Sequence, residues 1–231
     1  FTASHDGIGV RPLEGILPAE EIDNLCQIVQ ANDGQVSYKR NPDGTDSPYE
    51  LNITYIDAIL ADRSSENADK FLASQAIQYA LPGVPATYIH SLLGTRNWLA
   101  GVQQTGRART INRAQLAMEK VLEELQDPQS FRSHVFFPYL KLIATRKKQP
   151  AFHPNAGFEV LPLDSRLFVI NRFDASQHIS AVTNISSEPV ALNLNELGLQ
   201  APVTDLIGET HITANSLQVA PYQYMWLQKK T

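Results

Sequence analysis

The spacing of apolar residues changes near residue 157, and this change constrains the fold more than any other feature of the sequence. Before it, apolar residues recur at helical spacing in four long segments, 17–34, 65–83, 113–127 and 130–148. After it, the period drops to two, in the short runs 158–163, 167–173, 178–185, 190–194 and 217–228. Helical spacing predicts helices, and alternation predicts half-buried strands. The chain therefore reads as a helix-rich part followed by a small antiparallel sandwich or barrel.

Strand-like segments and a long loop separate the expected helices of the first part. Residues 84–94, "VPATYIHSLLG", are predicted to form a short apolar strand directly after a helix. A helix followed by such a strand is half of a βαβ unit. Residues 36–55 are dense in Asn, Pro, Asp, Gly and Ser and are predicted to form a loop. A loop of that length in a compact domain is often a binding loop or lid.

Composition excludes several classes of function. The net charge of −5 argues against a large nucleic-acid interface, and no apolar run approaches the ~18 residues of a membrane span. The single cysteine, Cys26, excludes an intramolecular disulfide, and its helical apolar position predicts a buried thiol. The sequence has no metal-ligand spacing and no phosphate-binding glycine loop, so neither a metal nor a cofactor is expected. A cytoplasmic location is expected.

Two groups of residues in the first part could carry chemistry. His5 and Asp6 place an imidazole beside a carboxylate, which suits ligand binding or stabilisation of a developing cation; a surface turn is the alternative. Arg107, Arg109 and Arg113 lie within seven residues, and guanidinium groups suit carboxylate, phosphate or vicinal hydroxyls. A solvated helix entry would explain these arginines equally well.

Two further positions have weaker signals. Tyr49 and Glu50 in the 36–55 segment could bind a sugar or phosphate, although an ordinary surface loop explains them as well. His153 stands between prolines at the junction of the two parts, and a packed junction is expected there rather than a ligand site.

Several motifs together resemble the sucrose phosphorylase-like branch of the α-amylase superfamily, glycoside hydrolase family 13. They follow one another in the same order as in that branch: "FTASHDGIGVRPLEG", "PYELNITYIDAI", "GVPATYIHSLLGTRN", "TGRARTINR" and "ATRKKQPAFHPNA". The resemblance covers essentially the whole chain. It implies that residues 1–156 are the C-terminal part of a (β/α)8 catalytic barrel and that residues 157–231 are a C-terminal β-sandwich-like domain.

The resemblance also implies roles for individual residues. Asp6 matches the carboxylate that stabilises the transition state, at the end of the seventh barrel strand, and His5 matches a sugar-hydroxyl contact. Arg113 matches the arginine that holds the glucosyl unit. Tyr49 matches the tyrosine associated with phosphate binding, and Glu50 lies where acceptor specificity is set.

The implied activity is retaining transfer of a glucosyl group between a sucrose-like glucoside and inorganic phosphate, giving glucose 1-phosphate. The nucleophile and the acid/base of that branch belong to barrel strands four and five, which this sequence lacks, so the chain alone is expected to be an inactive C-terminal fragment. Its unpaired strand edges and uncovered helix faces are expected to make it self-associate.

Alternatives to this activity remain. They are a related hydrolase or transglucosidase and a non-catalytic carbohydrate-binding module. The stretch "SPYELN" departs from the Asp-Leu-Tyr-Gln loop of sucrose-specific members at Ser47 and Glu50. It is closer to members that act on sucrose 6′-phosphate, glucosylglycerate or glucosylglycerol.

Overall fold

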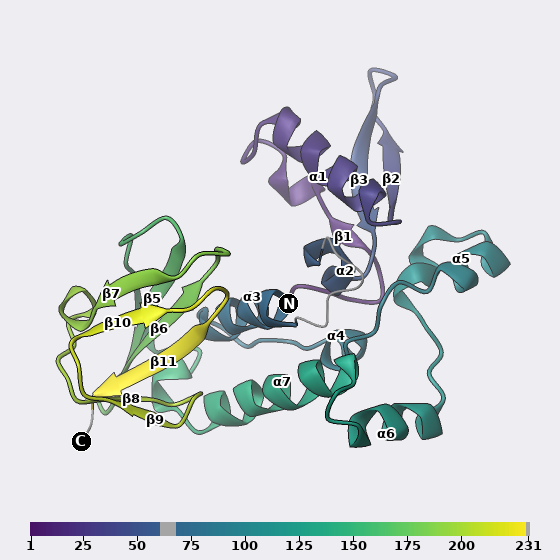
Figure 1. The fold of residues 1–231 in the computed structure, drawn as a ribbon. Coiled ribbons are helices and arrows are strands. Elements are labelled where there is room, and N and C mark those ends of the chain that lie inside the picture. Colours follow the sequence, from purple (N-terminus) through teal and green to yellow (C-terminus); the bar gives the residue numbers. More distant parts are fainter. Residues whose placement is uncertain (61–67, 230–231) are drawn as a thin grey trace. The chain divides into compact units, whose positions relative to one another are not determined.

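The computed structural model describes residues 1–60 and 68–229. The chain divides into two compact units, each made of two segments (Figure 1). Unit 1 comprises residues 1–66 and 86–136, and unit 2 comprises residues 67–85 and 137–231. Among the helices of the described residues, none combines the length and the apolarity needed to cross a bilayer.

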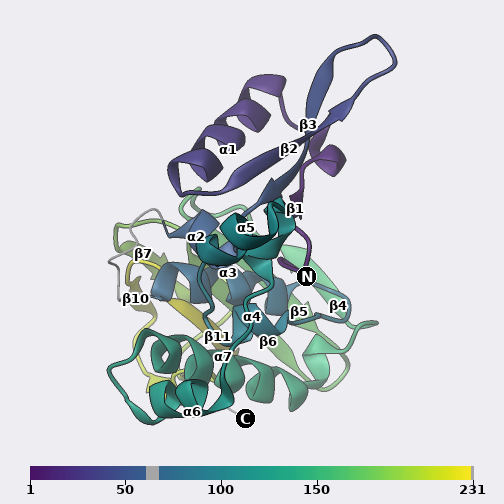
Figure 2. The same cartoon turned by 90° about the vertical axis from the view of Figure 1, so that its right-hand side faces the viewer.

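Unit 1 contains a three-stranded antiparallel sheet with one helix beside it (Figure 2). The strand order is β1 (Ile8–Gly9), β3 (Asp46–Asn52), β2 (Gln35–Arg40). The helix α1 (Ala19–Ala31) follows Pro18 and carries two glutamates in its first turn, where negative charge suits the helix dipole. It buries Ile22, Cys26 and Val29 against Leu51 of β3 and Ile53, the residue after that strand.

Cys26 is buried, as expected from its place in the apolar pattern. Burial raises the pKa of its thiol, and the neighbouring charge of Asp23 adds to that effect. A thiol that is harder to ionise is a poorer nucleophile, so Cys26 is a packing residue of α1.

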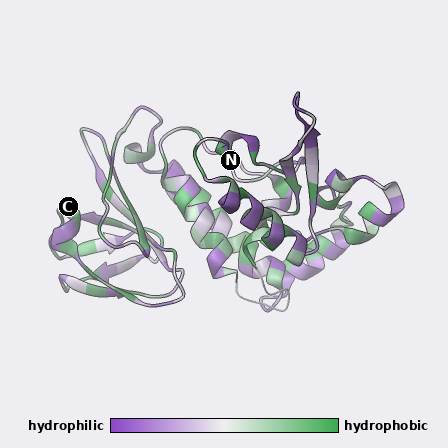
Figure 3. Ribbon diagram, turned by 90° about the horizontal axis from the view of Figure 1, so that it is seen from above, coloured by the Kyte–Doolittle hydropathy of each residue, from purple (hydrophilic) through white to green (hydrophobic). Residues whose placement is uncertain are grey.

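The loop expected at residues 36–55 is instead a β-hairpin, because the turn residues are confined to its tip. Asn41 accepts a backbone hydrogen bond from Gly44, which has a φ of 87°, and donates one to Thr45. The side chain of Asp43 accepts the backbone N–H of Thr45 at 2.9 Å. In Figure 3 the free end of this hairpin has the purple of hydrophilic residues.

The remaining helices of unit 1 are short, and one overturns an expectation. The segment 84–94 is not a strand, since residues 84–88 lie outside every strand and α4 begins at Ile89. The extended backbone before α4 is compatible with the apolar pattern, but a strand also requires a ladder partner. The helices are η1 (Arg11–Leu13), α2 (Tyr55–Ile59), α4 (Ile89–Leu92), α5 (Leu99–Thr105), η2 (Ala108–Asn112), α6 (Met118–Gln126) and the start of α7 (Phe131–Lys147).

Unit 2 contains two antiparallel sheets, so the antiparallel structure expected after residue 157 is confirmed. The larger sheet has the order β4 (Gly157–Val160), β5 (Leu167–Phe173), β6 (His178–Asn184), β11 (Tyr224–Lys229), β8 (Val203–Asp205), β9 (Thr210–Ile212). The smaller sheet pairs β10 (Ser216–Val219) with β7 (Val190–Asn193), and η4 (Leu194–Leu197) follows β7. The expected single strand at 217–228 is therefore two strands of different sheets, separated at Pro221.

Residues of both sheets share one apolar core, and the larger sheet is also covered on its other face. Met225 and Leu227 of β11 belong to the core between the sheets. The intervening Trp226 points to the opposite face, where its ring lies 4.5 Å from that of Phe152 in η3 (Pro150–Phe152). Because β5 and β6 are covered on both faces, nearly all of their residues are buried or half-buried, including the polar ones.

Helix α3 (Asp69–Ala80) completes unit 2, and its C-terminal end is held by arginines. Arg172 is fully buried and donates to the carbonyls of Ala80 and His153, both at 3.0 Å. Arg146 donates to the carbonyl of Tyr79 and to that of Gly83. The carbonyl end of a helix is its negative pole, so two guanidinium groups there satisfy both hydrogen bonding and charge.

Two expectations about this region have different outcomes. The side chain of His153 is exposed, so the packed junction expected there is wrong for this residue, although its carbonyl is held by Arg172. Ser65 and Asn67, either of which could cap α3 because Ser and Asn favour the N-cap position, lie outside the described residues.

Candidate active site

Asp6 is the centre of a cluster of charged side chains in unit 1. It lies in a bend before β1, outside any strand. Its Oδ1 atom is 3.0 Å from Nη2 of Arg113 and 3.2 Å from Nη1 of Arg109. Arg113 also donates through Nε to the carbonyl of His5 at 2.9 Å. Two arginines thus fix one oxygen of Asp6, and Oδ2 accepts no hydrogen bond from the described residues.

The hairpin residues Tyr49 and Glu50 join this cluster through Arg109. Nε and Nη2 of Arg109 donate to the two carboxylate oxygens of Glu50 at 2.8 and 3.0 Å, which is the bidentate fork geometry. Nη2 also lies 3.4 Å from the hydroxyl of Tyr49. One guanidinium therefore contacts both Asp6 and the hairpin.

A β-bulge explains how Tyr49 and Glu50 come to face Arg109. Glu50 pairs with Ser37, but the next pair along β2 is Tyr38 with Pro48, which leaves Tyr49 as the extra residue. Proline has no N–H to give to the ladder, and bulges re-aim the side chains beside them. The carbonyl of Tyr49 instead accepts a hydrogen bond from Val10 at 3.2 Å.

Arg109 lies within the 3-10 helix η2, and Arg113 directly follows its end. Ile111 and Asn112 within it are almost fully buried, and the carbonyl of Asn112 accepts the hydroxyl of Tyr88 at 2.6 Å. With η2 anchored in this way, Arg109 and Arg113 extend from it to Asp6.

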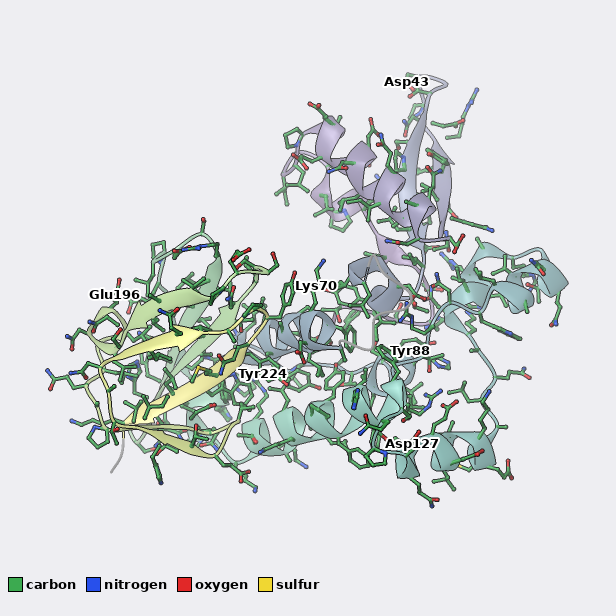
Figure 4. All side chains as sticks on the ribbon, in the orientation of Figure 1. Asp43, Lys70, Tyr88, Asp127, Glu196 and Tyr224 are labelled. Atoms are coloured by element: carbon green, nitrogen blue, oxygen red, sulfur yellow. The ribbon has the colours of Figure 1, made fainter. Side chains whose placement is uncertain are left out.

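Tyr88 stands just before α4, where Figure 4 labels it. Burial raises the pKa of its hydroxyl; the charge of Arg113 opposes that shift and the charge of Asp6 adds to it. Both charged groups therefore act on this tyrosine. The hydroxyl donates its proton to the carbonyl of Asn112 and keeps lone pairs that can accept a hydrogen bond.

The structure brings together most of the residues that the sequence singled out. Asp6, Tyr49, Glu50 and Arg113 all belong to the cluster, directly or through Arg109. The side chain of His5 is 66% exposed, and its Nε2 lies 3.6 Å from Oδ1 of Asp6.

Arg107, the third arginine of the motif, is exposed and lies outside the cluster. Within the described ranges, no three His, Cys, Asp or Glu side chains form a group that could hold a metal ion.

Arg109 and Tyr88 have an importance that the sequence does not reveal. Arg109 was one of three arginines in the motif "TGRARTINR", and spacing alone does not say which of them meets a carboxylate. Tyr88 lay in a segment expected to be a strand, with no signal in the surrounding residues that distinguishes it from a core aromatic.

Gly7 allows the backbone next to Asp6 to pass close to β3. A Cβ atom on Gly7 would overlap the carbonyl oxygen of Leu51 and lie 2.7 Å from Cγ of Glu50. We expect Gly7→Ala to lower the free energy of unfolding by roughly 1–3 kcal/mol, since backbone must move to make room. Gly9→Ala is the matched control, because a Cβ there meets nothing within 4 Å. Urea denaturation that shows equal losses for both variants would contradict this account.

His90, at the edge of the same unit, makes stability depend on pH. Burial lowers the pKa of its ring, and the charge of Arg132 lowers it further. The unfolded chain, with a histidine pKa of about 6.5, therefore takes up the proton first as pH falls. We expect the free energy of unfolding to decrease as pH drops below about 6.5, and this decrease to be smaller in His90→Gln. Urea denaturation at pH 7.5 and 5.5 measures both slopes, and equal slopes would contradict the prediction.

No family model matches the chain. It is 49% identical over 191 residues to a glucosylglycerate phosphorylase of Spirochaeta thermophila, a match that covers 80% of this chain and 32% of that protein. It is 38% identical over 231 residues to a glucosylglycerate phosphorylase of Escherichia coli, covering 99% of this chain and 41% of that protein. The chain thus spans about a third to two fifths of the length of these relatives.

A solved structure resembles the fold of the chain. The sucrose 6F-phosphate phosphorylase of Thermoanaerobacter thermosaccharolyticum matches with a TM-score of 0.66 and 26% sequence identity. The match covers 79% of this chain and 36% of that protein. The two relatives and the solved structure are all named as phosphorylases.

Proposed function

The chain belongs to the sucrose phosphorylase-like branch of the α-amylase superfamily, and on that premise we propose that it supplies part of the active site of a retaining glucoside phosphorylase. The observation that carries this proposal is the cluster around Asp6. A carboxylate fixed through one oxygen by Arg109 and Arg113 keeps its other oxygen available for a ligand. Tyr49 and Glu50 lie on the second side of the same cluster.

Each residue has a role in this proposal. Retaining glucosyl transfer passes through an oxocarbenium-like transition state between two carboxyl groups that act as nucleophile and acid/base. Asp6 is the third carboxylate, whose hydrogen bonds to the sugar hydroxyls strengthen as positive charge develops on the ring. Arg113 holds the glucosyl unit, His5 contacts a sugar hydroxyl, and Tyr49 contributes to phosphate binding.

The nucleophile and the acid/base are supplied by a part of the catalytic barrel that lies outside this sequence. Within the chain, the carboxylates of the cluster, Asp6 and Glu50, are both bound by Arg109. A carboxylate engaged in this way is poorly placed to transfer a proton or to attack an anomeric carbon. This chain by itself is therefore expected to show no phosphorolysis.

Glucosylglycerate is the donor we favour. The two relatives described above, 49% and 38% identical, carry the name glucosylglycerate phosphorylase. Ser47 and Glu50 stand where sucrose-specific members carry an acid and an amide, which argues against sucrose.

A donor panel assayed with the complete gene product tests the proposal. Glucosylglycerate, glucosylglycerol, sucrose and sucrose 6′-phosphate are incubated with and without inorganic phosphate, and glucose 1-phosphate is measured. We expect phosphate-dependent release of glucose 1-phosphate, fastest from glucosylglycerate. Release of free glucose without glucose 1-phosphate would identify a hydrolase and overturn the proposal.

A further inference from the structure

Arg109 contacts three functional groups with one guanidinium. Nε and Nη2 bind the carboxylate of Glu50, Nη2 also reaches the hydroxyl of Tyr49, and Nη1 lies 3.2 Å from Oδ1 of Asp6. The hydrogen bond to Glu50 raises the pKa of Arg109, and the charge of Glu50 adds to that effect. Arg113, by contrast, reaches Asp6 and the backbone of His5 without touching the hairpin.

Glu50 is engaged entirely in this contact. Its side chain is 7% exposed, and both of its oxygens accept from Arg109. A buried carboxylate requires a cation close by, because an unpaired charge there would be costly. Tyr49, in contrast, is 39% exposed and can meet a ligand directly.

We propose that Arg109 is a positioning residue that couples Glu50 and Tyr49 of the hairpin to Asp6, and that Glu50 acts on the reaction through Arg109 rather than by contacting the acceptor. This inference rests on the proposed function. Donor binding at Asp6 and phosphate binding at Tyr49 then share one rigid connection. The planar fork of arginine meets all three partners at once, which the single ammonium of lysine cannot do.

The first test is kinetic and uses the complete gene product. We expect Arg109→Lys to lower kcat/KM for phosphorolysis by about 10²-fold, because small displacements of reacting groups have effects of that size. Glu50→Gln removes the charge that orients Arg109 and should lower kcat/KM as well. The double variant Arg109→Lys/Glu50→Gln should be no worse than Arg109→Lys alone, since both changes break the same connection.

Arg40→Gln is the control, since Arg40 forms an exposed ion pair with Asp46 on the same hairpin. It should leave kcat/KM within about twofold of the unaltered enzyme, as surface pairs contribute little. Independent, additive effects of Arg109→Lys and Glu50→Gln would overturn the coupling, and so would a kcat/KM for Arg109→Lys within threefold of the unaltered enzyme.

A second measurement separates this inference from the proposed function. NMR of the chain itself, with ¹⁵N-labelled arginine, reports the Nε–H of Arg109 without any catalysis. We expect a resonance protected from solvent exchange that loses protection in Glu50→Gln and shifts in Asp6→Asn. The coupling would be refuted, even if the enzyme makes glucose 1-phosphate, by a resonance that is not protected from exchange. A resonance whose protection and chemical shift are unchanged by both substitutions would refute it as well. A protected resonance in a protein that makes none would instead reject the proposed function alone.

Discussion

Asp6→Asn is expected to lower kcat/KM for phosphorolysis by the complete gene product by about 10²- to 10³-fold. The substitution keeps the shape of the side chain but removes the negative charge that faces the developing oxocarbenium ion. Loss of one preorganised electrostatic contact has effects of this size in other enzymes. Steady-state kinetics with glucosylglycerate and phosphate measure the loss.

The matched control is Asp46→Asn. Asp46 also pairs with an arginine, Arg40 at 3.3 Å, but on the exposed part of the hairpin. It should leave kcat/KM nearly unchanged. Similar losses in both variants would mean that charge on this unit in general, and not Asp6 in particular, supports the reaction.

Arg172→Met is expected to have the largest effect on stability. The guanidinium is fully buried and satisfies the carbonyls of Ala80, at the end of α3, and of His153. Methionine would keep the length of the side chain but remove both hydrogen bonds; the carbonyl of His153 keeps the backbone N–H of Ala156 at 2.9 Å, whereas the carbonyl of Ala80 loses its arginine donor. Hydrogen bonds from a charged donor contribute about 1.5–3 kcal/mol each, so we expect the free energy of unfolding to fall by roughly 3–5 kcal/mol.

Urea denaturation followed by tryptophan fluorescence measures this loss, because Trp226 packs in the same unit. Arg166→Met is the control, since Arg166 pairs with Asp164 in an exposed turn. It should change the unfolding midpoint little. Equal midpoints for both variants would show that the buried guanidinium does not stabilise the end of α3.

The elements predicted best from sequence are those whose packing is encoded locally. Helix α1 follows from Pro18, its first-turn glutamates and its apolar face, and β5 and β6 follow from their period-two patterns bounded by turns. The short strands β8 and β9 were missed, because three residues are too few to show a period.

The predictions for the hairpin β2–β3 and for the segment before α4 were wrong for different physical reasons. In the hairpin, the polar residues of both strands resemble the true turn at Asn41–Thr45 in composition, so the whole stretch looks like a loop. Residues 84–88 have the apolar character of a strand, but pairing depends on a neighbouring strand that a local pattern cannot reveal.

The sequence predicts which residues belong to the candidate site, but it does not predict which of them contact one another. Asp6, Tyr49, Glu50 and Arg113 were identified from their motifs. The bulge at Tyr49 arises from the pairing of β2 with β3, and the choice of Arg109 over Arg107 arises from a contact between residues 59 positions apart. Such contacts are properties of the folded chain, which is why they appear only in the structure.

A crystal structure of the complete gene product with glucosylglycerate bound would test the central claim most directly. We predict that hydroxyl groups of the glucosyl ring lie within hydrogen-bonding distance, about 2.6–3.2 Å, of Asp6, with Arg113 and Tyr49 lining the same site. A glucosyl group bound elsewhere, with Asp6 contacting only Arg109 and Arg113, would contradict the account.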